Sequence, residues 1–258
     1  MNTERSVTRG ELLGHLVAHR IAGDVATSRA SNLANIEKML AREPEYWFGL
    51  ELDRPWSFDD VLKVLVSRVG IDADGARTKG VDRIDPELCL DALDDAASVI
   101  ARVARGRGRV MLGTGHPTGT LTLHLPIARA LRAAGCDVLT AGDGDWVEVI
   151  GERRRIRYVE GVATVGTGGD LMHTHSPEPM QHVLTRLPVP PDLVIADHGW
   201  AGAAAQAGVP TVGFADTNDP ALFVGAEEGK VAVAVPLDDN VLPAAYGPVA
   251  TYLLSGVG

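Results

Sequence analysis

The sequence predicts an α/β protein in which a helical N-terminal region, residues 1–105, precedes a Rossmann-like, mostly parallel sheet in residues 106–258. Two observations lead to this prediction. Apolar side chains recur at helical spacing in the first region, whereas the second contains short runs that are apolar at every position. These runs alternate with helical stretches, as in parallel sheets with right-handed crossovers. The second region is expected to carry the functional site.

Four segments of the N-terminal region have the apolar spacing of helices. They are residues 8–26, 27–44, 56–70 and 85–106. Gly23 is the expected end of the first helix, and Thr27 or Ser28 the expected N-cap of the second. Ser57 is the expected N-cap of the third helix, and Pro86 the first residue of the fourth.

Five apolar runs in the second region are predicted to be buried strands. They are residues 109–113, 136–140, 192–197, 211–216 and 230–236. Helical stretches at 121–135 and 199–208 separate some of them. Residues 145–166 are predicted to form an antiparallel hairpin inserted into the sheet or projecting over it.

Composition excludes several classes of partner. The formal charge of −10 argues against a nucleic acid, because no basic face is available for phosphates. The N-terminus lacks the apolar core of a signal peptide, and no apolar run approaches about 18 residues, so no membrane partner is expected. Cys89 and Cys136 have no CxxC partner, which argues against a disulfide or a thiolate metal site. A cytoplasmic location follows as the prediction.

Polar residues collect at the predicted carboxyl ends of the strands, where ligands bind in open α/β sheets. Asp197 and His198 end one strand, Asp216 ends the next, and Asp238 and Asp239 follow the last. Gathering carboxylates at one edge is electrostatically costly unless a cation or protons offset their repulsion. The sequence therefore favours a divalent cation at this edge.

Helix capping is the competing interpretation of these acids. Asp219 precedes Pro220 and is interpreted as an N-cap, which leaves Asp216 free for function. One of the three residues 238–240 is expected to cap the last helix.

The turn GTGHPTGT, residues 113–120, has GxGxxxG spacing rather than the dinucleotide spacing, and it lacks the Lys-Ser/Thr pair of a Walker loop. Its glycines are Gly113, Gly115 and Gly119. One interpretation is that the turn amides and Thr118 hold an anion at a helix N-terminus. The other is a tight strand-to-helix turn without a ligand. His116 favours the first, because a turn has no structural need for an imidazole before proline.

The HTHS segment places His173 and His175 on the same side of an extended chain, as two metal ligands or a ligand and a general acid require. Arg29 is expected either to contact a phosphate or to be an exposed arginine. The aromatic residues 46–48 either seal a pocket or fill the core.

These interpretations divide the candidate residues into three roles. The expected catalytic residues are His116, His175 and His198. The expected phosphate-binding residues are Gly113, Gly115, Thr118, Gly119 and Arg29. The expected metal ligands are Asp197, Asp216, Asp238, Asp239 and His173. The cation is Mg²⁺, Mn²⁺ or Zn²⁺, which the sequence does not distinguish.

The motifs GHPTG, HTHSPEPM, ADHGWAGAA, DTNDPA and VPLDDN resemble a group of actinobacterial proteins described as phosphatases. The resemblance covers most of the chain. It implies phosphate-ester hydrolysis, without naming a substrate, a metal or catalytic residues. The predicted architecture is also similar to metal-dependent phosphatases that join a helical region to a Rossmann-like sheet. Their Asp-Asn-Ala-Gly-Glu motif is missing here, so their ligands do not transfer.

Other phosphatase mechanisms lack their motifs in this chain. There is no DxDx[TV] nucleophile, no Arg-His-Gly after the first strand and no CxxxxxR loop. Among phosphatase mechanisms, attack by a metal-activated water is the one left. The predicted function is therefore a metal-dependent phosphatase acting on a small-molecule phosphate ester. The alternative is a Rossmann-like protein that binds a nucleotide or sugar phosphate without hydrolysis, with Asp143 or Asp145 holding a ribose. A sugar-nucleotide transferase is a third option, for which the chain is too short, and the sequence leaves a homo-oligomer open.

Overall fold

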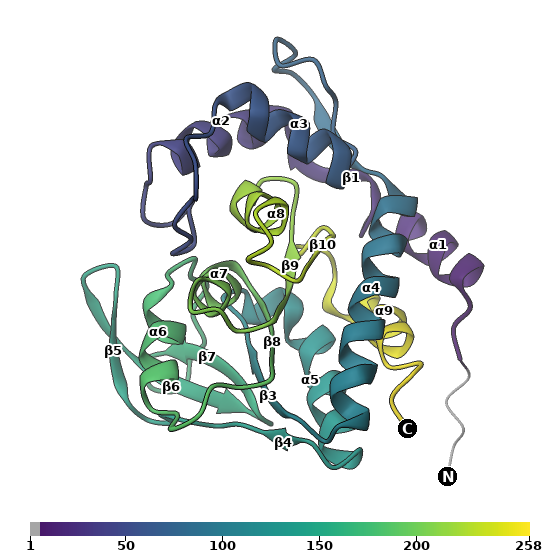
Figure 1. Ribbon diagram of the computed structural model, residues 1–258. Helices are drawn as coiled ribbons and strands as arrows, with labels where there is room; N and C mark the ends of the chain where they lie inside the picture. The colour runs from purple at the N-terminus through teal and green to yellow at the C-terminus, as the bar shows by residue number, and fades with distance from the viewer. Residues whose placement is uncertain (1–5) are drawn as a thin grey trace.

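The computed structural model describes residues 6–258 (Figure 1). Residues 1–5 of the predicted N-terminal region lie outside the described residues. The strands of the main sheet are β3 (Arg109–Gly113), β4 (Asp137–Val138), β5 (Trp146–Val149), β6 (Glu152–Val159), β7 (Val162–Gly166), β8 (Leu193–Asp197), β9 (Thr211–Ala215) and β10 (Val233–Pro236).

The main sheet has the strand order β10-β9-β8-β3-β7-β6-β5, with β4 paired to β3. All pairs from β10 to β7 are parallel, whereas β6 is antiparallel to both of its neighbours. This confirms an α/β protein with a mostly parallel sheet. The predicted hairpin forms one edge, and its last strand, β7, joins the parallel part beside β3.

The helices are α1 (Arg9–Ala18), α2 (Arg29–Leu40), α3 (Phe58–Arg68), α4 (Pro86–Arg105), α5 (Pro117–Ala133), α6 (Glu178–Thr185), α7 (His198–Gln206), α8 (Pro220–Glu227) and α9 (Gly247–Leu253), with a 3-10 turn, η1, at Pro243–Tyr246. Helices α6 and α7 lie on one side of the main sheet, and α4 and α5 on the other (Figure 1). Every residue of β7, β8 and β9 is buried, as expected for strands covered on both faces.

Two helix starts in the N-terminal region are confirmed. The Ser57 hydroxyl accepts a hydrogen bond from the Asp60 amide, and the Asp60 carboxylate accepts one from the Ser57 amide, which forms a capping box at α3. Pro86 is the first residue of α4 and follows the N-cap Asp85.

The helical prediction for residues 8–26 is wrong beyond Ala18. Strands β1 (Gly23–Ser28) and β2 (Val81–Ile84) form a separate antiparallel sheet. Gly23, the first residue of β1, has a φ of 84°, and buried and exposed residues then alternate as in a strand. Ser28 caps α2, so Thr27 is left in the strand with its side chain free for another contact.

Buried apolar side chains of both regions, from Leu12 to Leu253, belong to one cluster. The division into two domains at residue 105 stays a prediction. Within residues 6–258, no helix combines the length and the apolar character needed to cross a bilayer.

Candidate functional site

A pocket of about 250 Å³ lies where the parallel strands of the main sheet end. Its lining includes four histidines, three aspartates, two asparagines and Thr27, and it has no Lys or Arg side chain among residues 6–258. The loops after β3, β7, β8, β9 and β10 supply the charged groups, and β1 supplies Thr27. The predicted gathering of histidines and aspartates at this edge is therefore observed.

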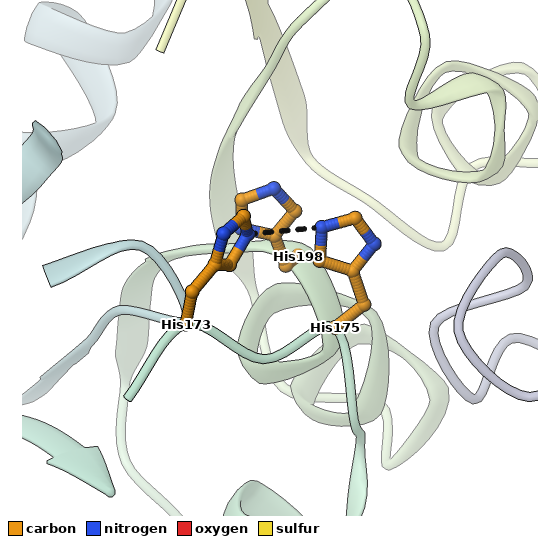
Figure 2. A group of neighbouring side chains, drawn as sticks. All are labelled: His173, His175 and His198. Atoms are coloured by element: carbon orange, nitrogen blue, oxygen red, sulfur yellow. Dashed lines mark hydrogen bonds between the residues drawn. The ribbon is translucent and has the colours of Figure 1, made fainter. Parts of the chain in front are cut away.

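Three imidazoles form the first possible ligand group, which we call the imidazole group: His173, His175 and His198. Figure 2 shows their rings close together, with His173 and His175 from the loop before α6 and His198 from the start of α7. The Nε2 atoms of His173 and His175 are 3.1 Å apart, and the rings of His175 and His198 stack at 4.3 Å. One ring nitrogen of each residue lies within 4.8 Å of the others.

The surroundings of His173 and His175 favour neutral imidazoles. Burial lowers the pKa of His173 to about 4 and that of His175 to about 3, with the neighbouring His198 adding to both shifts. The Nδ1 atom of His175 donates to the Glu45 carbonyl over 3.0 Å, which leaves its Nε2 lone pair facing the pocket. A neutral imidazole is the form that binds a metal.

Phe48 fills the space behind two of these rings. It is fully buried, and its ring meets those of His175 and His198 edge-on at 5.5 and 5.7 Å. Its φ of 56° is in the left-handed region, as is the φ of 45° at His198. Such strained residues persist where the surrounding structure holds them, which is common at functional sites.

A second group joins His198 to two acids. Its Nε2 lies 3.2 Å from Asp239 Oδ2 and 3.5 Å from Asp219 Oδ2. Burial alone would lower the pKa of His198, but Asp219, Asp197 and Asp239 together raise it well above the usual value. The same anionic surroundings that stabilise a proton on His198 would stabilise a metal cation in its place.

The third group, which we call the carboxylate group, consists of Asp216, Asp238 and Asp239. The Asp216 carboxylate accepts hydrogen bonds from the Thr27 hydroxyl and, at 2.6 Å, from the Thr217 amide. Burial raises the pKa of Asp216 well above its usual range, and Asp239 and Asp238 raise it further. Their repulsion is the cost that the sequence predicted for clustered acids.

Asp197, a predicted metal ligand, belongs to none of the three groups and does not line the pocket. Its Oδ1 accepts from the Gly115 amide at 2.6 Å and lies 3.0 Å from His198 Nδ1. Its Oδ2 accepts from the hydroxyls of Thr114 and Thr120 at 2.7 and 2.8 Å. The metal-ligand prediction is therefore corrected: Asp197 lies behind His198 and orients it.

The glycine turn does not form the predicted anion cradle. The Gly115 amide donates to Asp197, the His116 amide to Thr114 Oγ1, and the amides of Gly119 and Thr120 to the His116 carbonyl. Amides that are already bonded within the protein cannot also bind a phosphate.

The glycines instead allow close packing. A Cβ on Gly115 would lie 2.1 Å from the Thr174 carbonyl, and one on Gly119 would lie 2.3 Å from the Asp239 carbonyl. Gly113 packs closely against the Trp200 side chain. Thr118 is exposed and does not line the pocket. The predicted phosphate-binding roles of Gly113, Gly115, Thr118 and Gly119 are corrected accordingly.

Arg29 neither lines the pocket nor lies on the surface, so both predicted roles are wrong. It is fully buried, and its Nη1 donates to Asp82 Oδ2 over 2.9 Å. Asp82 also accepts from Asn32, whose side-chain oxygen accepts from the Thr217 hydroxyl. Arg29 thus stabilises a buried network that ends beside Asp216.

His116 lines the pocket from the turn. Its ring stacks on His173 at 4.4 Å, and its Nδ1 lies 3.4 Å from Asp239 Oδ2 without the geometry of a hydrogen bond. The Asp239 carboxylate raises the pKa of His116 in spite of burial, which favours the protonated imidazole.

Several pocket residues escaped sequence analysis. Asp219 stands at the N-cap position of α8, as interpreted, but caps no helix amide. Its Oδ2 accepts from the Asp216 amide at 3.2 Å and faces His198. The Asp-Pro pair was a misleading signal, and Thr27 was interpreted only as a possible N-cap of the second helix, a role that Ser28 fills. Asn218 and Asn240 also line the pocket without having been assigned to the site, and Glu45, outside the lining, contacts His175 through its carbonyl.

Comparison with known proteins gives two matches that span nearly the whole chain. A family model described as "Phosphatase" matches residues 7–258. A protein of Streptomyces coelicolor named "Phosphatase SCO2771" is 46% identical over 258 residues, which covers 97% of this chain and 97% of that protein. These matches confirm the resemblance to actinobacterial phosphatases.

Proposed function

The chain belongs to the Phosphatase family, and from that premise we propose that it is a metal-dependent phosphatase acting on a small-molecule phosphate ester. One observation carries the metal dependence. The pocket presents the neutral imidazoles of His173 and His175 and several buried carboxylates but, among residues 6–258, no Lys or Arg. A phosphate ester is anionic and would be repelled by the aspartates unless a cation neutralised them.

The donor atoms fit a divalent cation. The imidazole group offers three nitrogens within 4.8 Å of one another, and carboxylates adjoin it at His198. Imidazole ligands suit zinc or manganese better than magnesium. A bound cation of this kind lowers the pKa of its water and neutralises phosphate charge.

The remaining residues hold or move protons. Glu45 and Asp197 each bond the Nδ1 side of a ligand histidine, which leaves the Nε2 atoms of His175 and His198 directed at the pocket. His116 lines the pocket, belongs to none of the three groups and lies beside Asp239. We assign it as the general acid that protonates the leaving oxygen.

The size of the pocket supports a small substrate. Its volume of about 250 Å³ lies below the range of about 300–1,000 Å³ of typical drug-sized ligand sites. Phosphate with a short organic group fits this space. The cytoplasmic location and the homo-oligomer stay predictions from the sequence.

The rival hypothesis is a nucleotide or sugar-phosphate binding protein without hydrolysis. It depends on the glycine turn, whose amides at Gly115, His116, Gly119 and Thr120 bond within the protein. Asp145, one of its two candidate ribose ligands, instead contacts His182 and Arg186. Both observations disfavour this hypothesis.

The test is phosphate release from a panel of small phosphate esters, with protein stripped of metal and then supplied with Zn²⁺, Mn²⁺ or Mg²⁺. We expect release only after a metal is restored, and loss of release in His175→Ala. The exposed His19→Ala is the matched control and should behave as wild type. Ester binding without release under any metal would support the rival hypothesis.

A further inference from the structure

We propose that the pocket holds two cations of different chemical class at the same time. A borderline transition-metal ion would bind the imidazole group, and a hard, oxygen-preferring ion would bind the carboxylate group. The two groups share no residue, so filling one leaves every ligand of the other available. The inference rests on the proposed function for the use of the ions in phosphate chemistry.

The possible group formed by His198, Asp219 and Asp239 is not a third site. It shares His198 with the imidazole group and Asp239 with the carboxylate group. The Nε2 of His198 lies 3.2 Å from Asp239 Oδ2, so the two groups adjoin through this pair. Asp219 faces the same His198 nitrogen at 3.5 Å and stands at the junction of the two groups.

A second observation independently indicates a ligand at the carboxylate group. His116 is only 7% exposed, and its Nδ1 makes no hydrogen bond within the described residues. This nitrogen lies 3.4 Å from Asp239 Oδ2, outside hydrogen-bond geometry, beside the carboxylate group. A buried polar atom without a hydrogen bond is costly, and native proteins seldom leave one without a reason such as a bound ion or water.

Charge balance also favours two ions. Asp216, Asp219 and Asp239 line the pocket, and the buried Asp238 belongs to the carboxylate group with two of them. A phosphate monoester would add about two more negative charges to this space. One divalent cation leaves most of that charge unbalanced, whereas two cations can neutralise both the attacking and the leaving side of the phosphate.

The donor atoms predict which ion goes where. Three imidazole nitrogens suit Zn²⁺, and carboxylate oxygens suit Mn²⁺ or Mg²⁺. The carboxylate group is held for this role by neutral donors, since Asp238 accepts from the amides of Ala26 and Asn240 at 3.2 and 2.9 Å.

The experiment loads metal-free protein with one equivalent of Zn²⁺ and then titrates Mn²⁺, following free Mn²⁺ by electron paramagnetic resonance and total metal by mass spectrometry. We expect one Zn²⁺ and one Mn²⁺ per chain. Asp216→Asn should weaken Mn²⁺ binding at least roughly tenfold and leave Zn²⁺ binding unchanged. His173→Ala should weaken Zn²⁺ binding and leave Mn²⁺ binding unchanged. Asp238→Asn serves as a second carboxylate variant should Asp216→Asn fail to fold.

Exposed positions supply the matched controls: Asp143→Asn and His19→Ala should bind both ions as wild type does. A zinc-loaded protein that binds no Mn²⁺, or variants that each lose both ions together, would overturn the two-ion inference. A one-ion protein with metal-restored phosphate release would overturn this inference and leave the proposed function intact. Failure to bind any metal would overturn both.

Discussion

The edge of the main sheet and the N-terminal region contribute to the pocket in different ways. The sheet edge supplies the charged groups, including His116, His198 and Asp216, each directly or shortly after a strand. The N-terminal region supplies neutral contacts to them, through the Thr27 hydroxyl and the Glu45 carbonyl. The reactive groups therefore come from the sheet, and their orientation depends on a region whose described residues, 6–105, place no charged side chain in the pocket.

The largest expected effect tests the N-terminal region through Arg29→Met. It removes a partner from a fully buried ion pair and should lower the free energy of unfolding by about 3 kcal/mol. We take the lower end of the usual range because Arg77 still pairs with Asp82 at 3.1 Å. Chemical denaturation measures this change. As the control, Arg129→Met breaks an exposed ion pair and should lower the free energy of unfolding by less than about 1 kcal/mol. Equal losses of unfolding free energy in the two variants would show that Arg29 has no special structural role.

Asp216→Asn tests the sheet edge. It removes a charged ligand atom from the carboxylate group, so turnover should fall by roughly 100-fold or more while the fold remains intact. Steady-state phosphate release and circular dichroism measure the two properties. Wild-type activity in this variant would remove Asp216 from the mechanism.

Asp197→Asn tests orientation within the sheet edge. His198 would lose its charged partner at Nδ1, and Zn²⁺ affinity and turnover should each fall roughly 10- to 100-fold. A competition titration with a zinc chelator measures the affinity. Unchanged affinity with reduced turnover would place Asp197 in a role other than holding a ligand histidine.

Thr27→Val should have the smallest effect. The substitution keeps the shape of the side chain but removes its hydrogen bond to Asp216, so kcat should fall roughly fivefold, equivalent to about 1 kcal/mol. Thr118→Val makes the same change at an exposed turn position and should leave kcat unchanged. A larger loss in Thr118→Val would restore the turn as a phosphate site.

Much of the fold and the place of the site could be predicted from the sequence. Fully apolar runs identified β8 and β9, and the polar residues that follow them gather at one edge as parallel topology requires. The sequence thus predicted His173, His198 and Asp239 at one edge of the sheet, and all three line the pocket.

What the sequence could not predict depends on contacts between distant segments. Arg29 and Asp82 are separated by 53 positions in the sequence, and no local sequence pattern predicts their ion pair. Asp219 has the sequence context of a helix cap, although its carboxylate faces His198. The turn glycines have a spacing close to that of phosphate loops, and only the position of the Thr174 and Asp239 carbonyls reveals their packing role.

Those glycines also limit how the pocket can change. At Gly115 and Gly119 the missing side chains let the turn lie directly against the main chain of residues 174 and 239. Main-chain contacts do not change when side chains change rotamer. The distance between the turn and these two segments, and with it the width of the pocket, is therefore expected to stay constant. Variants with altered substrate range should therefore arise by exchanging lining side chains such as Asn218 or Asn240, while substitutions at either glycine should be rejected in any selection for activity.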